Sequence, residues 1–263
     1  MRRAHEAPVS IFDTVQSVTD YDYFLVHLFE ENLEYWQHAE NAVIQKREVI
    51  LDNSIFELGT AFESERYFYW INKLNPTWFI IPDVLEETES TIVKLDDWFT
   101  KYNTPSGIKT IGVVQGKTYE EIVRCYKHVA PRVNKVAISF DYSYYTKSIS
   151  DSVTTNKYEK YMLGRIKLVN DLLKDNIIDT NKPHHLLGCS LPQEFIAYKG
   201  MEWIDSVDTS NPIVHGINNI IYSDRGLDDK VSTKLIEYIN YEVNSIQFAN
   251  ILYNIERFKE FTS

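Results

Sequence analysis

Residues 110–140 read TIGVVQGKTYEEIVRCYKHVAPRVNKVAISF and give the clearest indication of the fold. Residues 110–115 and 133–140 are short apolar runs rich in β-branched side chains, which is typical of buried strands. Residues 119–130 between them place apolar side chains at helical spacing. A strand, a helix and a second strand in this order predict two parallel strands joined by a crossover helix.

The same alternation extends outward over most of the chain. We expect eight strands, at 21–27, 49–52, 78–81, 110–115, 133–140, 184–188, 203–207 and 217–222. Helices are expected between them at 63–73, 88–101, 119–130, 158–174 and 192–199. This pattern predicts an α/β fold of the (β/α)8 TIM-type barrel class, with residues 1–263 as a single domain.

Three segments lie outside this repeat. Residues 1–20 are expected to be a lead-in to the first strand. Residues 141–156 are polar and are expected to form an extended loop, which in such a barrel usually serves binding. Residues 228–261 carry apolar side chains near helical spacing and predict one long or broken helix that closes the barrel.

Composition and charge exclude several classes of protein. The chain has 27 Lys and Arg residues against 38 Asp and Glu residues, a formal net charge of -11, which argues against binding of nucleic acid by a global positive field. Its two cysteines, Cys125 and Cys189, have no CxxC spacing and cannot form a disulfide framework or a usual zinc site. No apolar run reaches the roughly 18 residues of a membrane span. We therefore expect a cytoplasmic protein. We also expect no metal and no cofactor.

Polar residues follow several of the expected strands where each strand ends. In a TIM-type barrel the catalytic face is formed by the carboxyl ends of the strands and the loops after them. The residues at these ends are Asp52, Asn53, Asp83, Gln115, Gly116, Gly188, Cys189, Asp205 and Asp208. Any one of the aspartates alone is more often a helix cap or a turn former. Several carboxylates and an amide on one face instead predict a catalytic or binding site.

Two adjacent histidines, His184 and His185, lie in an expected strand and could be mistaken for metal ligands or a general base. Their side chains point to opposite faces of the sheet, so at most one of them faces the barrel interior. No further side chains with metal-ligand spacing accompany them. We expect no metal site there.

Four of these segments resemble the queuine and archaeosine tRNA-guanine transglycosylases, together with phage and bacterial relatives that insert 7-deazaguanines into DNA. ILDNS at 50–54 is similar to the segment in which an Asp opens a D-S-G-G motif, although Asn53, Ile55 and Phe56 depart from it. VVQG at 113–116 is similar to I-V-Q-G, LGCSLPQE at 187–194 to G-G-L-A-V-G-E, and GMEWIDSV at 200–207 to G-x-x-x-F-D-C-V. The segments occur in the family's order and span most of the expected barrel.

The resemblance implies a role for each matching residue. Asp205 would be the nucleophile, and Asp52 would be the general acid and base. Asp83 and Gln115 would hold the base, and Gly188 would offer it a backbone group. The other residues expected to bind substrate are Asn53, Gly116, Cys189 and Asp208. Of these, Asp208 is also a rival nucleophile, because it follows Asp205 closely in the same segment.

The implied activity is a transferase reaction that exchanges guanine for a preQ0-like 7-deazaguanine through a covalent Asp–sugar ester. A carboxylate can capture the oxocarbenium-like state formed when a glycosidic bond breaks, and a second group must protonate the leaving base. The tRNA enzymes carry a zinc site of three Cys and one His, which two cysteines cannot supply. DNA is therefore favoured over tRNA as substrate, and a phage protein of this kind would act in its host's cytoplasm.

The expected partners are a nucleic acid and a free 7-deazaguanine base. A base inside a duplex must leave the stack to reach such a pocket, and local basic groups would then meet the phosphates. The candidates are Lys117, Arg124, Lys127, His128, Arg132 and Lys135 in one stretch, and Lys157, Lys160, Arg165 and Lys167 in another. For any single one of these residues, a solvated helix face is the more frequent role.

Other functions stay open at this point. The chain could be a tRNA-guanine transglycosylase, or a non-catalytic partner subunit that binds nucleic acid or docks on an active relative. It could also be a barrel hydrolase acting on a nucleoside or glycoside, with the two aspartates used as in a retaining glycosidase. The sequence does not decide whether the chain forms a homodimer.

Overall fold

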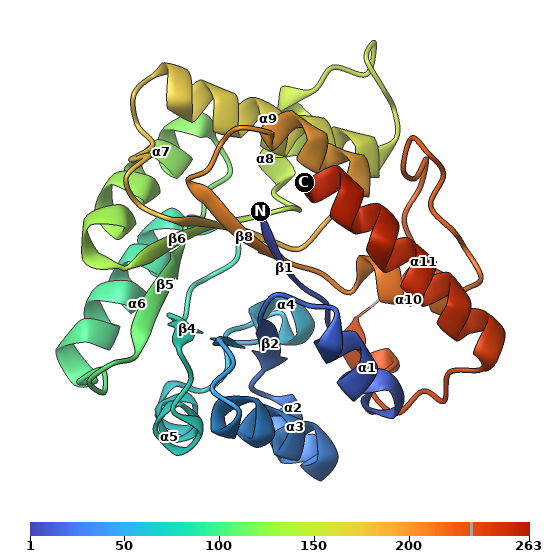
Figure 1. The fold of residues 1–263 in the computed structure, drawn as a ribbon. Coiled ribbons are helices and arrows are strands. Elements are labelled where there is room, and N and C mark those ends of the chain that lie inside the picture. Colours follow the sequence, from blue (N-terminus) through green and yellow to red (C-terminus); the bar gives the residue numbers. More distant parts are fainter. Residues whose placement is uncertain (232–233) are drawn as a thin grey trace. The chain divides into compact units, whose positions relative to one another are not determined.

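The computed structural model describes residues 1–231 and 234–263, and it has the predicted α/β architecture of the (β/α)8 TIM type. Eight strands belong to one sheet, helices alternate with them along the chain, and every strand pairing within either unit defined below is parallel (Figure 1). The chain divides into two compact units. Unit 1 contains Met1–Val18 and Ser139–Ser263, and unit 2 contains Thr19–Ile138. The extent of a single domain over residues 1–263 stays a prediction.

Unit 2 is a run of neighbouring parallel strands with helices between them. Its strands, in spatial and chain order, are β2 (Asp22–Leu25), β3 (Val49–Asp52), β4 (Trp78–Ile80), β5 (Lys109–Val113) and β6 (Lys135–Ser139), of which Ser139 falls in unit 1. Its helices are α2 (Leu28–Glu31), α3 (Leu33–Ile44), α4 (Ile55–Leu58), α5 (Ser64–Leu74), α6 (Thr88–Lys101), α7 (Tyr119–Val129) and the 3-10 turn η2 (Ala130–Arg132). Five of the predicted strands and three of the predicted helices are confirmed here.

Capping and aromatic packing fix these helices against the strands. The Thr118 side chain accepts a hydrogen bond from Glu121 N and starts α7. On α5, the Tyr67 hydroxyl lies 2.8 Å from Leu51 O and 3.0 Å from Ile80 O, which ties this helix to β3 and β4 together. Tyr67 also packs on Trp98 of α6. α5 therefore holds the carboxyl-terminal parts of β3 and β4 in place.

Unit 1 contains the other three strands. β1 (Arg2–Ala4), β8 (Ile204–Asp208) and β7 (His184–Leu187) are neighbours in this order and are parallel. Its helices are η1 (Val9–Ile11), α1 (Phe12–Ser17), α8 (Ser143–Ser148), α9 (Lys157–Lys174), η3 (Pro192–Tyr198), α10 (Asn211–Ile217), η4 (Leu235–Glu237) and α11 (Ser245–Thr262). The predicted strands at 184–188 and 203–207 and the predicted helix at 158–174 are confirmed.

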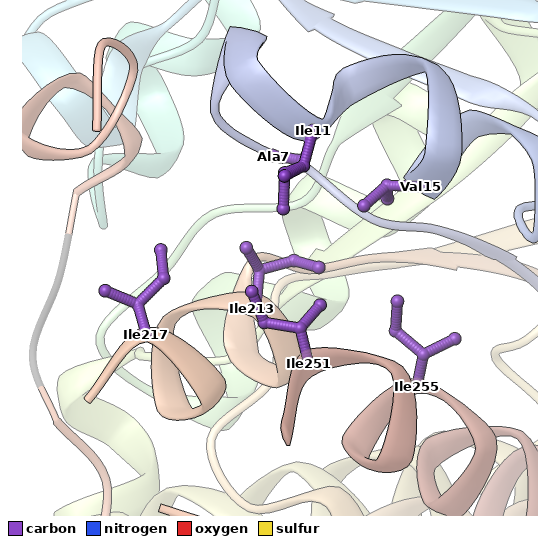
Figure 2. Packing of buried hydrophobic residues seen from close by; sticks show 7 residues of the cluster. All are labelled: Ala7, Ile11, Val15, Ile213, Ile217, Ile251 and Ile255. Carbon is purple, nitrogen blue, oxygen red and sulfur yellow. The ribbon is translucent and has the colours of Figure 1, made fainter. Parts of the chain in front are cut away.

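An aliphatic cluster joins the first and last helices of unit 1. It consists of Ala7, Ile11, Val15, Ile213, Ile217, Ile251 and Ile255, whose side chains converge in Figure 2. α10 and α11 approach closely at Gly216, where an added Cβ would lie 2.7 Å from Ile251 N. Because backbone atoms cannot yield as a side chain can, only glycine permits this helix contact.

The predicted strand at 217–222 is wrong. Ile217 is the last residue of α10, and the eighth strand is instead β1, inside the expected lead-in. Residues 218–222 form no strand, and Tyr222 N donates a hydrogen bond to the side-chain oxygen of Asn254 on α11. A short apolar run does not distinguish a strand from other buried backbone. β1 reads Arg-Arg-Ala and carries no apolar signal of its own.

Three other predicted segments differ in detail. Within 228–261 the long helix is only α11, which begins at a capping box on Asn244; residues 232–233 lie outside the described residues. The expected loop at 141–156 contains α8, because Tyr145 is buried against Gly164 of α9. Residues 192–198 form a 3-10 helix rather than an α-helix. Among the described residues, no helix combines the length and apolar character needed to cross a bilayer.

Two buried histidines make the stability of unit 1 sensitive to pH. Burial lowers the pKa of His184 and of His215 to about 4, while in each ring Nδ1 contacts a main-chain carbonyl, at 2.9 Å from Lys182 O and 2.8 Å from Asn211 O. In the unfolded chain a histidine binds a proton near pH 6.5. The stabilisation is therefore fully present above about pH 6.5 and is lost as the pH falls toward about 4.

We expect the free energy of unfolding to fall by roughly 2 kcal/mol or more per histidine between pH 7 and pH 4. Urea unfolding at several pH values measures it, with His184→Gln and His215→Gln as variants. Each variant should flatten the wild-type dependence in this window. Parallel curves for the wild-type protein and both variants would contradict the expectation.

Candidate functional site

In unit 2, four of the predicted site residues meet at the carboxyl ends of three neighbouring strands. Asp52 is the last residue of β3 and Asn53 follows it, Asp83 follows β4, and Gln115 follows β5. Because these strands are parallel and adjacent, their carboxyl ends share one edge. All four side chains are buried. The sequence prediction that these residues come together is confirmed.

Asp83 is the acceptor at the centre of this group. Asn53 Nδ2 donates to Asp83 Oδ1 at 2.9 Å, and Gln115 Nε2 donates to Oδ2 at 2.6 Å. Burial raises the pKa of the Asp83 carboxyl, and the two hydrogen bonds partly offset that rise. The side-chain amides of Asn53 and Gln115 cannot be flipped by 180°, because Asn53 Oδ1 accepts a hydrogen bond from Ile55 N and Gln115 Oε1 accepts one from Glu86 N. The network therefore requires an acceptor at both oxygens of residue 83.

We expect Asp83→Asn to destabilise the protein by about 1–3 kcal/mol, because its new NH2 group would face a fixed donor. Removing a buried charge acts in the opposite direction, but it does not remove the contact between two donors. Urea unfolding measures the difference. Asp97→Asn on the exposed face of α6 is the matched control and should change stability by less than about 0.5 kcal/mol. Equal stability of Asp83→Asn and the wild-type protein would refute this account of the network.

Two hydrogen-bond donors from unit 2 fix the Asp52 carboxylate. The Tyr23 hydroxyl donates to Asp52 Oδ2, and Ser54 N donates to Oδ1. Ser54 has a left-handed φ of 62°, which turns the chain sharply after β3. The negative charge of Asp52 adds to burial in raising the pKa of the Tyr67 phenol. Asp52 is thus an oriented carboxylate at the end of its strand.

Gly116 and Cys125 hold the chain at Gln115 against α7. A Cβ on Gly116 would lie 2.8 Å from Ile122 N, so this glycine lets β5 approach the first turn of α7. Gln115 N lies 3.3 Å from Cys125 Sγ, and burial raises the pKa of that thiol to about 11. Gly116 therefore has a packing role, and Cys125 is not a thiolate nucleophile.

In unit 1, the carboxylate at the carboxyl end of a strand is Asp208. It is the last residue of β8, and its side chain is 7% exposed. His185 Nε2 lies 2.9 Å from Asp208 Oδ1, and Gly188 N donates to the same oxygen at 3.3 Å. His185 Nδ1 lies 3.0 Å from Ser206 Oγ. No residue in 1–231 or 234–263 donates a hydrogen bond to Asp208 Oδ2, so one oxygen of this carboxylate is fixed by donors and the other is not.

Asp205 does not lie at this end of the strand. It is the second residue of β8, roughly 10 Å along the strand from Asp208, and it faces the opposite side of the sheet. Arg2 of β1 binds both its oxygens, with Nε 3.2 Å from Oδ1 and Nη2 2.7 Å from Oδ2. The expectation that Asp205 lies at the catalytic face is therefore wrong, because the strand does not end at Asp205 but continues to Asp208.

Asp205 instead lines a cavity of about 350 Å³ at the amino ends of β1 and β8. Tyr198, Met201 and Ile204 contribute to its wall. Within a (β/α)8 fold the amino-terminal side of the strands serves stability rather than chemistry. We therefore assign no role in catalysis to this cavity.

Gly188 and Cys189 form the turn after β7. Gly188 has a left-handed φ of 64°, and a Cβ there would lie 2.5 Å from Phe140 Cδ1, so the turn requires glycine for both reasons. Burial raises the pKa of the Cys189 thiol well above its usual range. Lys230 Nζ donates to Cys189 O at 2.7 Å. Cys189 therefore contributes its backbone to the turn, and its thiol is inert.

Two of the predicted phosphate-binding residues are buried and have other roles. Lys135 Nζ lies 4.3 Å from the centre of the Trp78 ring, and Arg165 pairs with Glu194. Both are wrong as phosphate contacts, because a fully buried cation cannot reach a backbone phosphate. Several others already pair with carboxylates: Lys117 with Glu87, Arg124 with Glu89, His128 and Arg132 with Asp96, Lys160 with Asp151, and Lys167 with Asp171.

His185 is the functional candidate that the sequence prediction passed over. In the register of β7 and β8 it is the partner of Ser206, and Asp208 lies two residues further on the same face. A signal for it was available, because alternation in the two neighbouring strands places His185, Ser206 and Asp208 on one face. From the sequence, His185 came into question only as a metal ligand or a general base, and it was assigned neither role. Within the described parts of the chain, no three His, Cys, Asp or Glu side chains are arranged to hold a metal ion.

No protein-family model matches this chain, and a comparison with curated proteins finds no significant match. The resemblance to the guanine transglycosylases therefore stays a prediction from the motifs. The geometry of Asp208 and of the Asp83 network stands independently of it.

Proposed function

We propose that the protein is a glycosyltransferase that exchanges guanine for a preQ0-like 7-deazaguanine in DNA, with Asp208 as the nucleophile. The observation that supports the proposal is the asymmetry of the Asp208 carboxylate. Two donors fix Oδ1, while Oδ2 accepts no hydrogen bond from the described residues. Such a carboxylate has a defined orientation and one oxygen available for attack.

The proposed reaction is a double displacement at the anomeric carbon C1′. Asp208 Oδ2 forms a bond to C1′ while the bond from C1′ to N9 of guanine breaks and its electron pair goes to the base. A general acid protonates the leaving guanine. The incoming 7-deazaguanine then gives its N9 proton back to the group that protonated guanine, attacks C1′ and releases the Asp208 carboxylate, to which His185 and Gly188 N again donate. Retention at C1′ follows from two inversions.

The resemblance to the transglycosylases implies the remaining roles, which fall to residues of unit 2. Asp52, oriented by Tyr23 and Ser54 N, is the candidate general acid and base. Each oxygen of Asp83 accepts one hydrogen bond and keeps a second lone pair, which suits the N1–H and exocyclic amine of a guanine edge. Gln115 and Asn53 keep Asp83 in place, so we assign them to orientation of that carboxylate.

The test is to trap the covalent intermediate. The wild-type protein is incubated with end-labelled single-stranded DNA, duplex DNA and a tRNA transcript, each containing guanine, and is then denatured and separated by electrophoresis. We expect a labelled protein band with DNA and incorporation of labelled guanine in a parallel exchange assay. A band with tRNA alone would reassign the substrate to RNA. Release of base from free nucleosides without exchange would replace the proposal with a hydrolase, and no band and no exchange would overturn it.

A further inference from the structure

A buried ion pair lies directly behind the turn that contains Gly188. Arg165 on α9 and Glu194 on η3 have no exposed side-chain surface. Arg165 Nε donates to Glu194 Oε1 at 2.6 Å and Nη2 donates to Oε2 at 3.1 Å, and the Tyr198 hydroxyl donates to Oε1 at 2.7 Å. Removing two charges from water costs about as much as their attraction returns, and apolar residues often serve stability equally well. Stability alone does not account for this pair.

Two further N–H groups of Arg165 bind the backbone of the turn. Nη1 donates to Leu187 O at 2.9 Å, and Nη2 donates to Gly188 O at 3.1 Å. Leu187 O belongs to the same peptide unit as the Gly188 N–H, which donates to Asp208 Oδ1. In a trans peptide the C=O and N–H point in opposite directions, so fixing the oxygen on one side aims the N–H on the other.

Glu194 orients the guanidinium for this task. Its two oxygens bind Nε and Nη2 side by side, which sets the plane of the Arg165 group and turns Nη1 and Nη2 toward the two carbonyls. A cation on the peptide oxygen also polarises the peptide and strengthens its N–H as a donor. Lysine could supply the charge but not this planar set of donors.

We infer that Arg165 is a positioning residue for Asp208, acting through the peptide that links Leu187 and Gly188. Its catalytic consequence rests on the proposed function, because only the exchange reaction uses Asp208 as a nucleophile. The positioning itself is a property of the turn and is measurable without any substrate. Arg165 thus has a structural link to the site in place of the phosphate contact predicted from the sequence.

The experiment uses the full chain with Arg165→Met, Glu194→Met and Tyr198→Phe combined, which removes both charges of the ion pair together with the hydroxyl that binds it and leaves no unpaired charge. Hydrogen exchange of individual amides is followed by NMR, and kcat and KM are measured with the DNA substrate. We expect the Gly188 amide to exchange at least about tenfold faster relative to the Val207 amide of β8. We also expect kcat to fall about tenfold or more while KM stays within about twofold.

Two further variants make the result specific. Asn254→Leu is the matched control, because Asn254 Nδ2 also donates to two main-chain carbonyls of unit 1, Pro212 O and Ile220 O, without touching the Gly188 turn. This control variant should leave the ratio of the Gly188 and Val207 amide exchange rates unchanged. It should also leave kcat unchanged. Arg165→Lys should fall between the triple variant and the wild-type protein in both measurements.

The outcomes separate this inference from the proposed function. If the amides of unit 1 exchange faster together, or if the Gly188 amide and kcat are unchanged in the triple variant, the positioning role is refuted. If the Gly188 amide responds selectively but the wild-type protein exchanges no base, the positioning role stands and the transglycosylase proposal fails.

Discussion

Replacing Asp208 with Asn is expected to abolish the covalent protein–DNA adduct and to lower the exchange rate by at least about 10³-fold. An amide has almost the same shape as the carboxylate but is not a nucleophile toward C1′. The amide oxygen can still accept from His185 Nε2 and Gly188 N, so the variant should fold normally. Electrophoresis after denaturation measures the adduct, and thermal unfolding checks the fold.

Asp205→Asn is the matched control for this prediction. It removes the other aspartate of β8 and weakens a partly exposed ion pair with Arg2, which should cost no more than about 1 kcal/mol. Adduct formation and exchange should be retained. If Asp205→Asn abolished the adduct while Asp208→Asn kept it, the nucleophile would have to be sought at the amino end of β8.

The second large effect is expected from Gly188→Ala, which should lower the exchange rate about 10²-fold and destabilise the protein by roughly 2–4 kcal/mol. An alanine at a φ of 64° is strained, and its Cβ would lie 2.5 Å from Phe140 Cδ1. Relief of that contact turns the Gly188 N–H away from Asp208. Urea unfolding and the DNA exchange assay measure the two effects.

Gly200→Ala separates backbone strain from steric contact. Gly200 has a φ of 83° and no heavy atom within 4 Å of the position of its Cβ, so an alanine there carries the strain alone. We expect a loss of about 1–2 kcal/mol and unchanged exchange activity. If Gly188→Ala lowered stability and exchange activity no more than Gly200→Ala, neither the contact with Phe140 nor the hydrogen bond to Asp208 would matter for the reaction.

The fold was predictable because periodicity is strong wherever a strand is apolar and a helix is amphipathic. α6 lies at the residues predicted for it, and seven of the eight predicted strands exist. β1 was not predictable in this way, since Arg-Arg-Ala becomes a strand only through its pairing with β8. α10 was missed for a related reason, because the apolar residues at its end were interpreted as a strand.

The candidate site was predictable in its unit 2 part and less so in unit 1. Asp52, Asn53, Asp83 and Gln115 follow strands whose ends the sequence marks clearly, and the structure brings them to one edge. In the segment IDSVD the sequence does not show at which aspartate the strand ends. Strand register and hydrogen bonds decide between them, because they pair Asp205 with Arg2 and Asp208 with His185.

The discontinuity of unit 1 bears on the order in which the molecule assembles. β1 pairs with β8, whose residues follow it by about 200 positions, whereas unit 2 is one continuous segment, Thr19–Ile138. During synthesis from the amino terminus, residues 2–4 have no strand to pair with until β8 has left the ribosome. Unit 2 can collapse in the meantime. We therefore expect the slow step of folding to be the pairing of β1 with β8, which is a long-range contact.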